Sequence, residues 1–159
     1  LAAADAARTR LAAATRQGAV RTAAAGTPSA PRAGRLLWPA QGPKTSDFGW
    51  RTHPLFGTRS FHAGIDIGAG HGAPIWAADA GVVVAAAARG GYGNTVVVDH
   101  GEGLSTLYAH QSRVAARPGQ AVSRGQVIGY VGSSGYSTGP HLHFETREDG
   151  TPVDPMRYL

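Results

Sequence analysis

The feature that most constrains the fold is the series of short apolar runs, separated by glycine and proline, that begins after Arg35. Val, Ile, Tyr and Trp cluster in these runs, and no segment of ten or more residues shows the periodicity of an amphipathic helix. Turn-forming sequences such as RGGYG, HGEG and RPGQ lie between the runs. The pattern is typical of an all-β domain. We expect a compact, twisted antiparallel sheet or a barrel-like sandwich with long cleft-forming loops.

The apolar runs predict seven β-strands, which cover residues 60–67, 74–77, 81–87, 94–99, 105–110, 126–131 and 141–146. Strands of this number and length fit one domain, which we place at residues 35–159. Four loops are expected to wall a cleft, and their Gly, Ser and Tyr content suits a slim, extended peptide; they cover residues 44–59, 89–93, 111–120 and 133–139.

Residues 1–34 differ in composition and are rich in Ala and Arg. Large apolar residues are too few there to bury a helical face, so we expect a helical or disordered tail that ends in a linker. The tail holds five Arg against one acid, a balance of +4, whereas residues 35–159 hold ten basic and nine acidic residues, a balance of +1. Because the positive charge belongs to the tail, we expect no nucleic-acid-binding domain.

The chain contains no Cys, which excludes disulfides and thiolate metal sites. No apolar run approaches the roughly 18 residues of a membrane span, so no transmembrane segment is predicted in this chain. Because the chain begins at Leu1 rather than Met, we expect a processed product, for which an upstream signal, anchor or stalk stays open. We expect a monomer.

The segment Gly132–Glu145, GSSGYSTGPHLHFE, joins a loop to a strand with polar side chains on one face. The alternation in HLHFE places His141, His143 and Glu145 on that face. Two imidazoles and a carboxylate are costly to place together for packing alone. We interpret this face as half of an active site.

Two further segments carry His or Asp on a predicted strand. In FHAGIDIG, His62 and Asp66 lie four residues apart, which returns to the same face of an extended strand, and Gly64 leaves room for an ion. The segment LSTLYAH ends in His110, which the same alternation places beside Tyr108. Each pattern alone is also typical of a structural His or a surface pair. Convergence of three separate segments is what favours a common site.

Two imidazoles and one carboxylate suit zinc, which accepts N and O ligands in a tetrahedral shell with one position left for water. His62, Asp66 and His143 would supply this set. No HExxH sequence provides a Glu base, so a free imidazole, His110 or His141, is the candidate for proton transfer. A two-His-one-carboxylate iron site is the rival metal centre. Its His and carboxylate are separated by one residue, whereas here three intervene.

The segments HAGID, YAH and STGPHLHFE, in this order, resemble the signature of the lysostaphin-like and LytM-like zinc metallopeptidases, which cut peptidoglycan peptides. FGWRTHPLFG, GYGNTVVVDH and GQVIGYVGSSG also resemble that family's framework, so the likeness covers about residues 36–155. The resemblance implies that His62, Asp66 and His143 bind Zn²⁺ and that His110 and His141 are the catalytic pair.

Residues around these five positions carry further expectations. Glu145 is predicted to orient an imidazole from behind, and Tyr108 and His53 are predicted to lie at or near the cleft. Gln111 stands where the family often has Leu, a departure that touches none of the five positions.

The resemblance implies a zinc-dependent endopeptidase that hydrolyses amide bonds in peptidoglycan stem peptides or cross-bridges, with a metal-activated water and a His general base. Peptidoglycan peptides are then its partners, and its location is extracytoplasmic, whether secreted, periplasmic or cell-wall associated. The alternative is a catalytically silent cell-wall-binding or amidase-activating module of the same fold. Such relatives usually lack some of the five positions, and this chain keeps them all.

Overall fold

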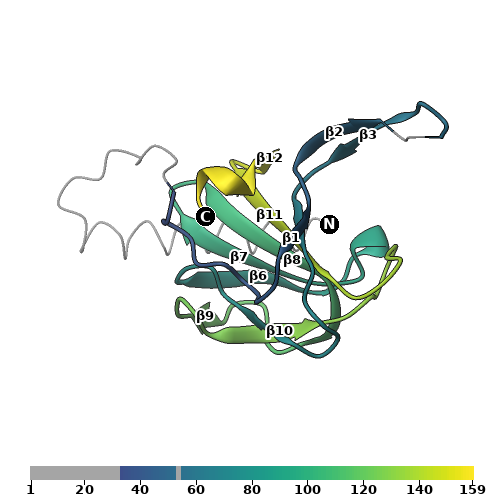
Figure 1. The fold of residues 1–159 in the computed structure, drawn as a ribbon. Coiled ribbons are helices and arrows are strands. Elements are labelled where there is room, and N and C mark those ends of the chain that lie inside the picture. The colour runs from purple at the N-terminus through teal and green to yellow at the C-terminus, as the bar shows by residue number, and fades with distance from the viewer. Residues whose placement is uncertain (1–32, 53–54) are drawn as a thin grey trace.

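A computed structural model describes residues 33–52 and 55–159, which form one large antiparallel sheet and a separate hairpin (Figure 1). The strands are β1 (Lys44–Ser46), β2 (Gly49–Thr52), β3 (Arg59–His62), β4 (Ile65–Ile67), β5 (Pro74–Trp76), β6 (Gly81–Ala88), β7 (Asn94–Gly101), β8 (Leu104–Val114), β9 (Ala121–Val122), β10 (Val127–Val131), β11 (Leu142–Glu148) and β12 (Thr151–Val153). Two short 3₁₀ turns, η1 (Gly90–Tyr92) and η2 (Pro155–Arg157), are the helical elements of this part of the chain. The all-β prediction is confirmed, whereas the predicted tail lies almost entirely outside the described residues.

The order of the main sheet is β1-β4-β11-β8-β7-β6-β9, with β10 paired to β5 and β8, and β12 paired to β11. Strand β8 lies in the middle and is buried on both faces. One face of β8 carries Tyr108, which packs against Phe144 of β11 in the main core, and the other carries Leu107 and Ala109 of a smaller cluster. Within the described residues, no helix has the length and apolar character needed to span a membrane.

The predicted strand at residues 60–67 is divided in two. Strand β3 pairs with β2 in the hairpin, whereas β4 pairs with β1 and β11 in the main sheet. The break lies at Gly64, where a Cβ atom would come within 2.2 Å of the Phe144 carbonyl oxygen, so glycine is required by close packing against β11. The alternation of Phe61 with Ile65 predicts that both side chains lie in the core, but Phe61 lies in the hairpin and is 45% exposed, whereas Ile65 is buried.

The hairpin of β2 and β3 projects from the main sheet, as Figure 1 shows at its upper right. Its outer face carries Trp50 and Phe61, whose ring centroids lie 5.4 Å apart, and the guanidinium of Arg59 lies over Trp50. Strands β1, β2, β9 and β12, which contain two to four residues each, were not predicted.

Candidate active site

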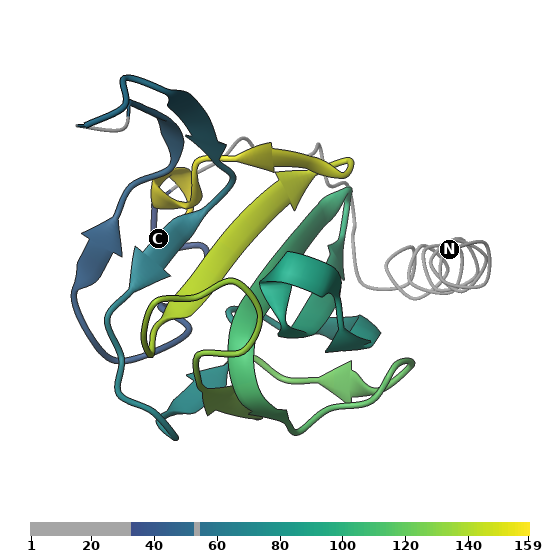
Figure 2. The same ribbon diagram turned by 90° about the vertical axis from the view of Figure 1, so that its right-hand side faces the viewer.

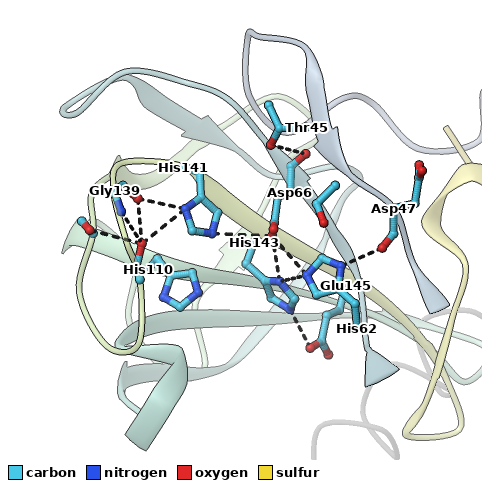
Figure 3. Close-up of polar contacts among 12 residues, drawn as sticks. Thr45, Asp47, His62, Asp66, His110, Gly139, His141, His143 and Glu145 are labelled. Atoms are coloured by element: carbon cyan, nitrogen blue, oxygen red, sulfur yellow. Dashed lines mark hydrogen bonds and ion pairs between the residues drawn. The ribbon is translucent and has the colours of Figure 1, made fainter. Parts of the chain in front are cut away.

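Three side chains from three strands present one donor atom each to a common point (Figure 3). His62 Nε2 lies 3.2 Å from His143 Nδ1 and 3.3 Å from Asp66 Oδ1, and the last two atoms are 3.1 Å apart. The sheet produces this convergence, because antiparallel pairing of β4 with β11 places His143 opposite Asp66. The structure therefore brings the three predicted ligands together.

The chemistry and spacing of these donors fit zinc. A tetrahedral zinc ion with bonds of about 2.0–2.1 Å holds its ligand atoms about 3.3 Å apart. The far nitrogen of each ring is already engaged: His62 Nδ1 lies 2.8 Å from the carbonyl oxygen of Asp47, and His143 Nε2 lies 2.9 Å from Glu145 Oε1. Hydrogen bonds to these acceptors fix the tautomers and leave the two near nitrogens with lone pairs for a metal.

The electrostatics of the cluster also favour a cation. Burial acts to raise the pKa of Asp66, but without a metal the hydrogen bonds and charges that protonated His143 and His62 rings offer outweigh it and hold that pKa below its ordinary value. Burial acts in the opposite direction on His143, and hydrogen bonds to Asp66 and Glu145 raise its pKa above the ordinary value. Two carboxylates therefore stabilise positive charge beside this ring, and a metal ion bound there would displace the proton and take the place of its charge.

Glu145 is fully buried behind His143 and belongs to a polar network. The Tyr92 hydroxyl donates a 2.6 Å hydrogen bond to Glu145 Oε1, and Arg147 Nε donates one of 2.8 Å to Oε2. Burial acts to raise the pKa of Glu145, but the bonds with His143 and Tyr92 and the charge of Arg147 keep it below its ordinary value. Arg147 was not predicted, and Tyr92 was predicted only as part of the cleft loop at residues 89–93, not as a partner of Glu145. The alternation of β11 continues from Glu145 to Arg147 and could have identified Arg147, whereas no sequence spacing links Tyr92 to Glu145.

His110 and His141 form a second pair beside the donor cluster, with ring centroids 4.9 Å apart. Nδ1 of His110 donates to the Ser134 carbonyl at 2.7 Å, and Nδ1 of His141 donates to the Gly139 carbonyl at 2.9 Å. Neither Nε2 forms a hydrogen bond with another described residue, and that of His141 lies 3.6 Å from Asp66 Oδ1. Burial lowers the pKa of His110, and the neighbouring imidazoles add to this effect.

The prediction that places Tyr108 beside His110 is wrong. His110 has a φ of 60°, and Asn94 and Val96 of β7 pair with Gln111 and Tyr108 of β8, so two steps of β7 oppose three of β8. This bulge breaks the alternation. Tyr108 instead packs against Phe144 in the core, where its hydroxyl accepts a 2.9 Å hydrogen bond from the Ala78 N–H. His53 lies outside the described residues.

A cleft of about 530 Å³ gives access to both groups of side chains. Three of the four predicted loops line it, through Arg51, Tyr92 and residues 136–138. Figure 2 shows the η1 turn beside the loop that precedes β11, and the Tyr136 N–H donates a 2.9 Å hydrogen bond to the Gly91 carbonyl. The fourth predicted loop, residues 111–120, contributes no lining residue, because β8 continues to Val114.

Comparison with known proteins identifies peptidases as relatives of this chain. The profile of peptidase family M23 matches residues 60–155. The DD-carboxypeptidase/endopeptidase Mpg of Neisseria meningitidis serogroup B is 48% identical over 112 residues, which are 70% of this chain and 26% of that protein. The peptidoglycan DD-endopeptidase ShyA of Vibrio cholerae is 41% identical over 107 residues, 67% of this chain and 25% of that protein. The chain thus spans about a quarter of the length of these curated relatives.

Solved structures share the fold. A zinc-containing peptidase from Vibrio cholerae superposes with a TM-score of 0.71 at 36% identity, over 75% of this chain and 38% of that one. The catalytic domain of lysostaphin from Staphylococcus simulans superposes with a TM-score of 0.65 at 33% identity, over 72% of this chain and 90% of that one. The family match includes all five predicted site positions and covers more than half of the chain. The chain therefore belongs to peptidase family M23.

Proposed function

We propose that this chain is a zinc-dependent endopeptidase that hydrolyses amide bonds between peptidoglycan stem peptides, with residues 35–159 as its peptidase domain. The observation that carries this proposal is the pairing of two groups on one cleft: three donor atoms 3.1–3.3 Å apart, and two imidazoles with a free Nε2. Relatives named as DD-endopeptidases support the substrate class. Such a substrate implies an extracytoplasmic location.

His62, Asp66 and His143 are the proposed zinc ligands. Bound there, zinc would supply Lewis acidity, lowering the pKa of a water molecule towards about 7 and polarising the scissile carbonyl. Glu145 holds the His143 ring so that Nδ1 faces the other two donors, and Tyr92 and Arg147 hold Glu145.

His110 and His141 are the proposed catalytic pair. Each donates its Nδ1–H to a backbone carbonyl, which fixes the ring and leaves Nε2 available to the substrate. One ring accepts the proton of the attacking water and passes it to the leaving amine, and the other donates a hydrogen bond to the developing negative charge. The lowered pKa of His110 keeps that ring neutral, and therefore able to accept a proton, near pH 7.

Incubation of the zinc-loaded chain with cross-linked muropeptides and with a pentaglycine peptide, followed by mass spectrometry, tests the proposal. We expect cleavage of the cross-linked muropeptides and little of pentaglycine, and no cleavage by a His141→Ala protein that still binds zinc. Intact muropeptides after incubation with zinc-bound, unmutated protein would overturn the proposed activity.

A further inference from the structure

Arg51 is the cationic side chain among the described residues that line the cleft. It lies on β2 opposite Ser60 of β3, on the same face of the hairpin as His62. The hairpin therefore turns Arg51 towards the cleft, whereas Arg59, on the opposite face, lies over the ring of Trp50 with its guanidinium carbon 5.0 Å from the centroid.

The guanidinium of Arg51 is fixed but not neutralised. Its Nη1 donates a 2.5 Å hydrogen bond to Ser46 Oγ, a neutral acceptor, and no carboxylate of the described residues pairs with it. In contrast, Lys44 pairs with Asp47 at 2.6 Å, and Arg147 pairs with Glu145 at 2.7 Å. The Nε and Nη2 edge of Arg51 is therefore available for a two-point interaction with a carboxylate.

The carboxylates near the cleft do not compete with a substrate for Arg51. The carboxylate of Asp66 is engaged by His62 and His143, and that of Glu145 is fully buried. Among the described lining residues, the substrate therefore meets one guanidinium, on the hairpin, while Tyr92 of the η1 turn and Tyr136 of the loop before β11 supply uncharged lining. This asymmetry suits a peptide that carries negative charge on one side of the scissile bond.

We propose that Arg51 is a specificity-determining residue that binds a free carboxylate of the substrate near the scissile amide. The cleft then selects anionic stem peptides over uncharged chains such as a glycine bridge. The inference rests on the proposed function and names the substrate feature that the site recognises.

The test uses two cross-linked stem peptides that are identical except that the carboxylate beside the cross-link is either a free acid or a carboxamide. We expect the zinc-loaded chain to prefer the acid about tenfold in kcat/KM, since charge-assisted hydrogen bonds have this strength at an exposed site. Arg51→Gln should remove the preference, mainly by raising KM for the acid, and Arg51→Lys should keep part of it. The preference should also decline as salt is added.

Arg59→Gln is the matched control, because it removes the same charge from the other face of the same hairpin and should keep the preference. Equal kcat/KM for acid and carboxamide, or a preference that survives Arg51→Gln, would overturn the role of Arg51 and leave the proposed peptidase intact. Cleavage of neither peptide would overturn the peptidase. In that case calorimetric binding of both peptides to the His141→Ala protein decides on Arg51, and equal affinities would refute its role. Thermal melts establish that each variant is folded.

Discussion

Each of the four site imidazoles is held by its nitrogen that faces away from the cluster. Three rings bond to backbone carbonyls, and the fourth bonds to a carboxylate; the pairs are His62 with Asp47, His110 with Ser134, His141 with Gly139, and His143 with Glu145. A side-chain carboxylate can be removed by substitution, whereas a backbone carbonyl cannot. Glu145 is therefore the position at which orientation of a ligand can be tested.

Glu145→Ala should lower zinc affinity and kcat/KM by about 10- to 100-fold, because His143 loses the acceptor that orients its ring. The change also leaves Arg147 and the Tyr92 hydroxyl without their buried acceptor, so the free energy of unfolding should fall by about 3 kcal/mol. Zinc titration against a chromophoric chelator and thermal melts measure the two effects.

Glu148→Ala is the control, since Glu148 lies on the same strand but accepts a hydrogen bond from Tyr158 away from the site. Unchanged zinc affinity and rate in Glu145→Ala would show that Glu145 does not position His143.

His100 provides a residue-scale prediction about stability. Its Nδ1 lies 2.8 Å from the Ala80 carbonyl oxygen and its Nε2 lies 2.7 Å from Thr106 Oγ1, and burial lowers its pKa below the ordinary value of 6.5. Between the folded and unfolded pKa values the unfolded chain binds more protons. The stability contributed by neutral His100 is therefore present above about pH 6.5 and is lost as the pH falls further.

Neutral His100 should contribute a decline in the free energy of unfolding as the pH falls from 7 to 5, and His100→Gln should remove this contribution from the slope. Denaturant titrations across this range measure the slope. His71→Gln, at an exposed turn, should keep the slope of the unmutated protein. An identical slope in all three proteins would refute the contribution of His100.

Strands were predictable from the sequence where apolar and polar residues alternate regularly along them. Strand β11 follows its alternation from Leu142 to Glu148, so the shared face of His143 and Glu145 was visible in the sequence. Two features broke the rule elsewhere: the bulge at His110, which turned Tyr108 into the core, and the close approach at Gly64, which divides β3 from β4. Both arise from contacts with distant strands, which local alternation does not encode.

The loops around Gly93 and Ser134 interlock beside the proposed catalytic pair, and glycine makes this interlock feasible. Gly93 has a φ of 66°, and a Cβ atom there would lie 2.4 Å from the carbonyl carbon of Ser134, whose oxygen accepts the hydrogen bond from His110. Gly93→Ala should therefore displace Ser134 and lower kcat at least about tenfold, together with the melting temperature.

Gly90→Ala is the matched control for this clash. Gly90 also has a positive φ, of 54°, but a Cβ atom there would meet nothing within 4 Å. It should cost about 1 kcal/mol of stability and retain the activity. Equal kcat values for the two variants, measured on the same cross-linked peptide, would show that the interlock does not position His110.

The whole domain has a core that does not depend on the site. Buried residues such as Ile65, Tyr108 and Phe144 fill the main cluster, whereas the donor residues line the cleft. Zinc removal by a chelator should therefore leave the far-ultraviolet circular dichroism spectrum unchanged and abolish peptide hydrolysis. Addition of zinc should then raise the melting temperature again. At a free zinc concentration of 100 times the dissociation constant, the free energy of unfolding should increase by about 2.7 kcal/mol.

The His62→Ala protein should show no such zinc-dependent rise, because it lacks one of the three proposed ligands. An unfolded metal-free protein, or a melting temperature that does not respond to zinc, would contradict this view of a prefolded domain that binds its metal in the cleft.

The position of the metal can be measured directly by anomalous diffraction at the zinc edge from crystals of the zinc-loaded protein. We expect one peak bound by His62 Nε2, Asp66 Oδ1 and His143 Nδ1 at about 2.0–2.2 Å, with His110 and His141 beside it and uncoordinated. A peak elsewhere, or one ligated by His110 or His141, would contradict the division of these residues into metal ligands and catalytic pair.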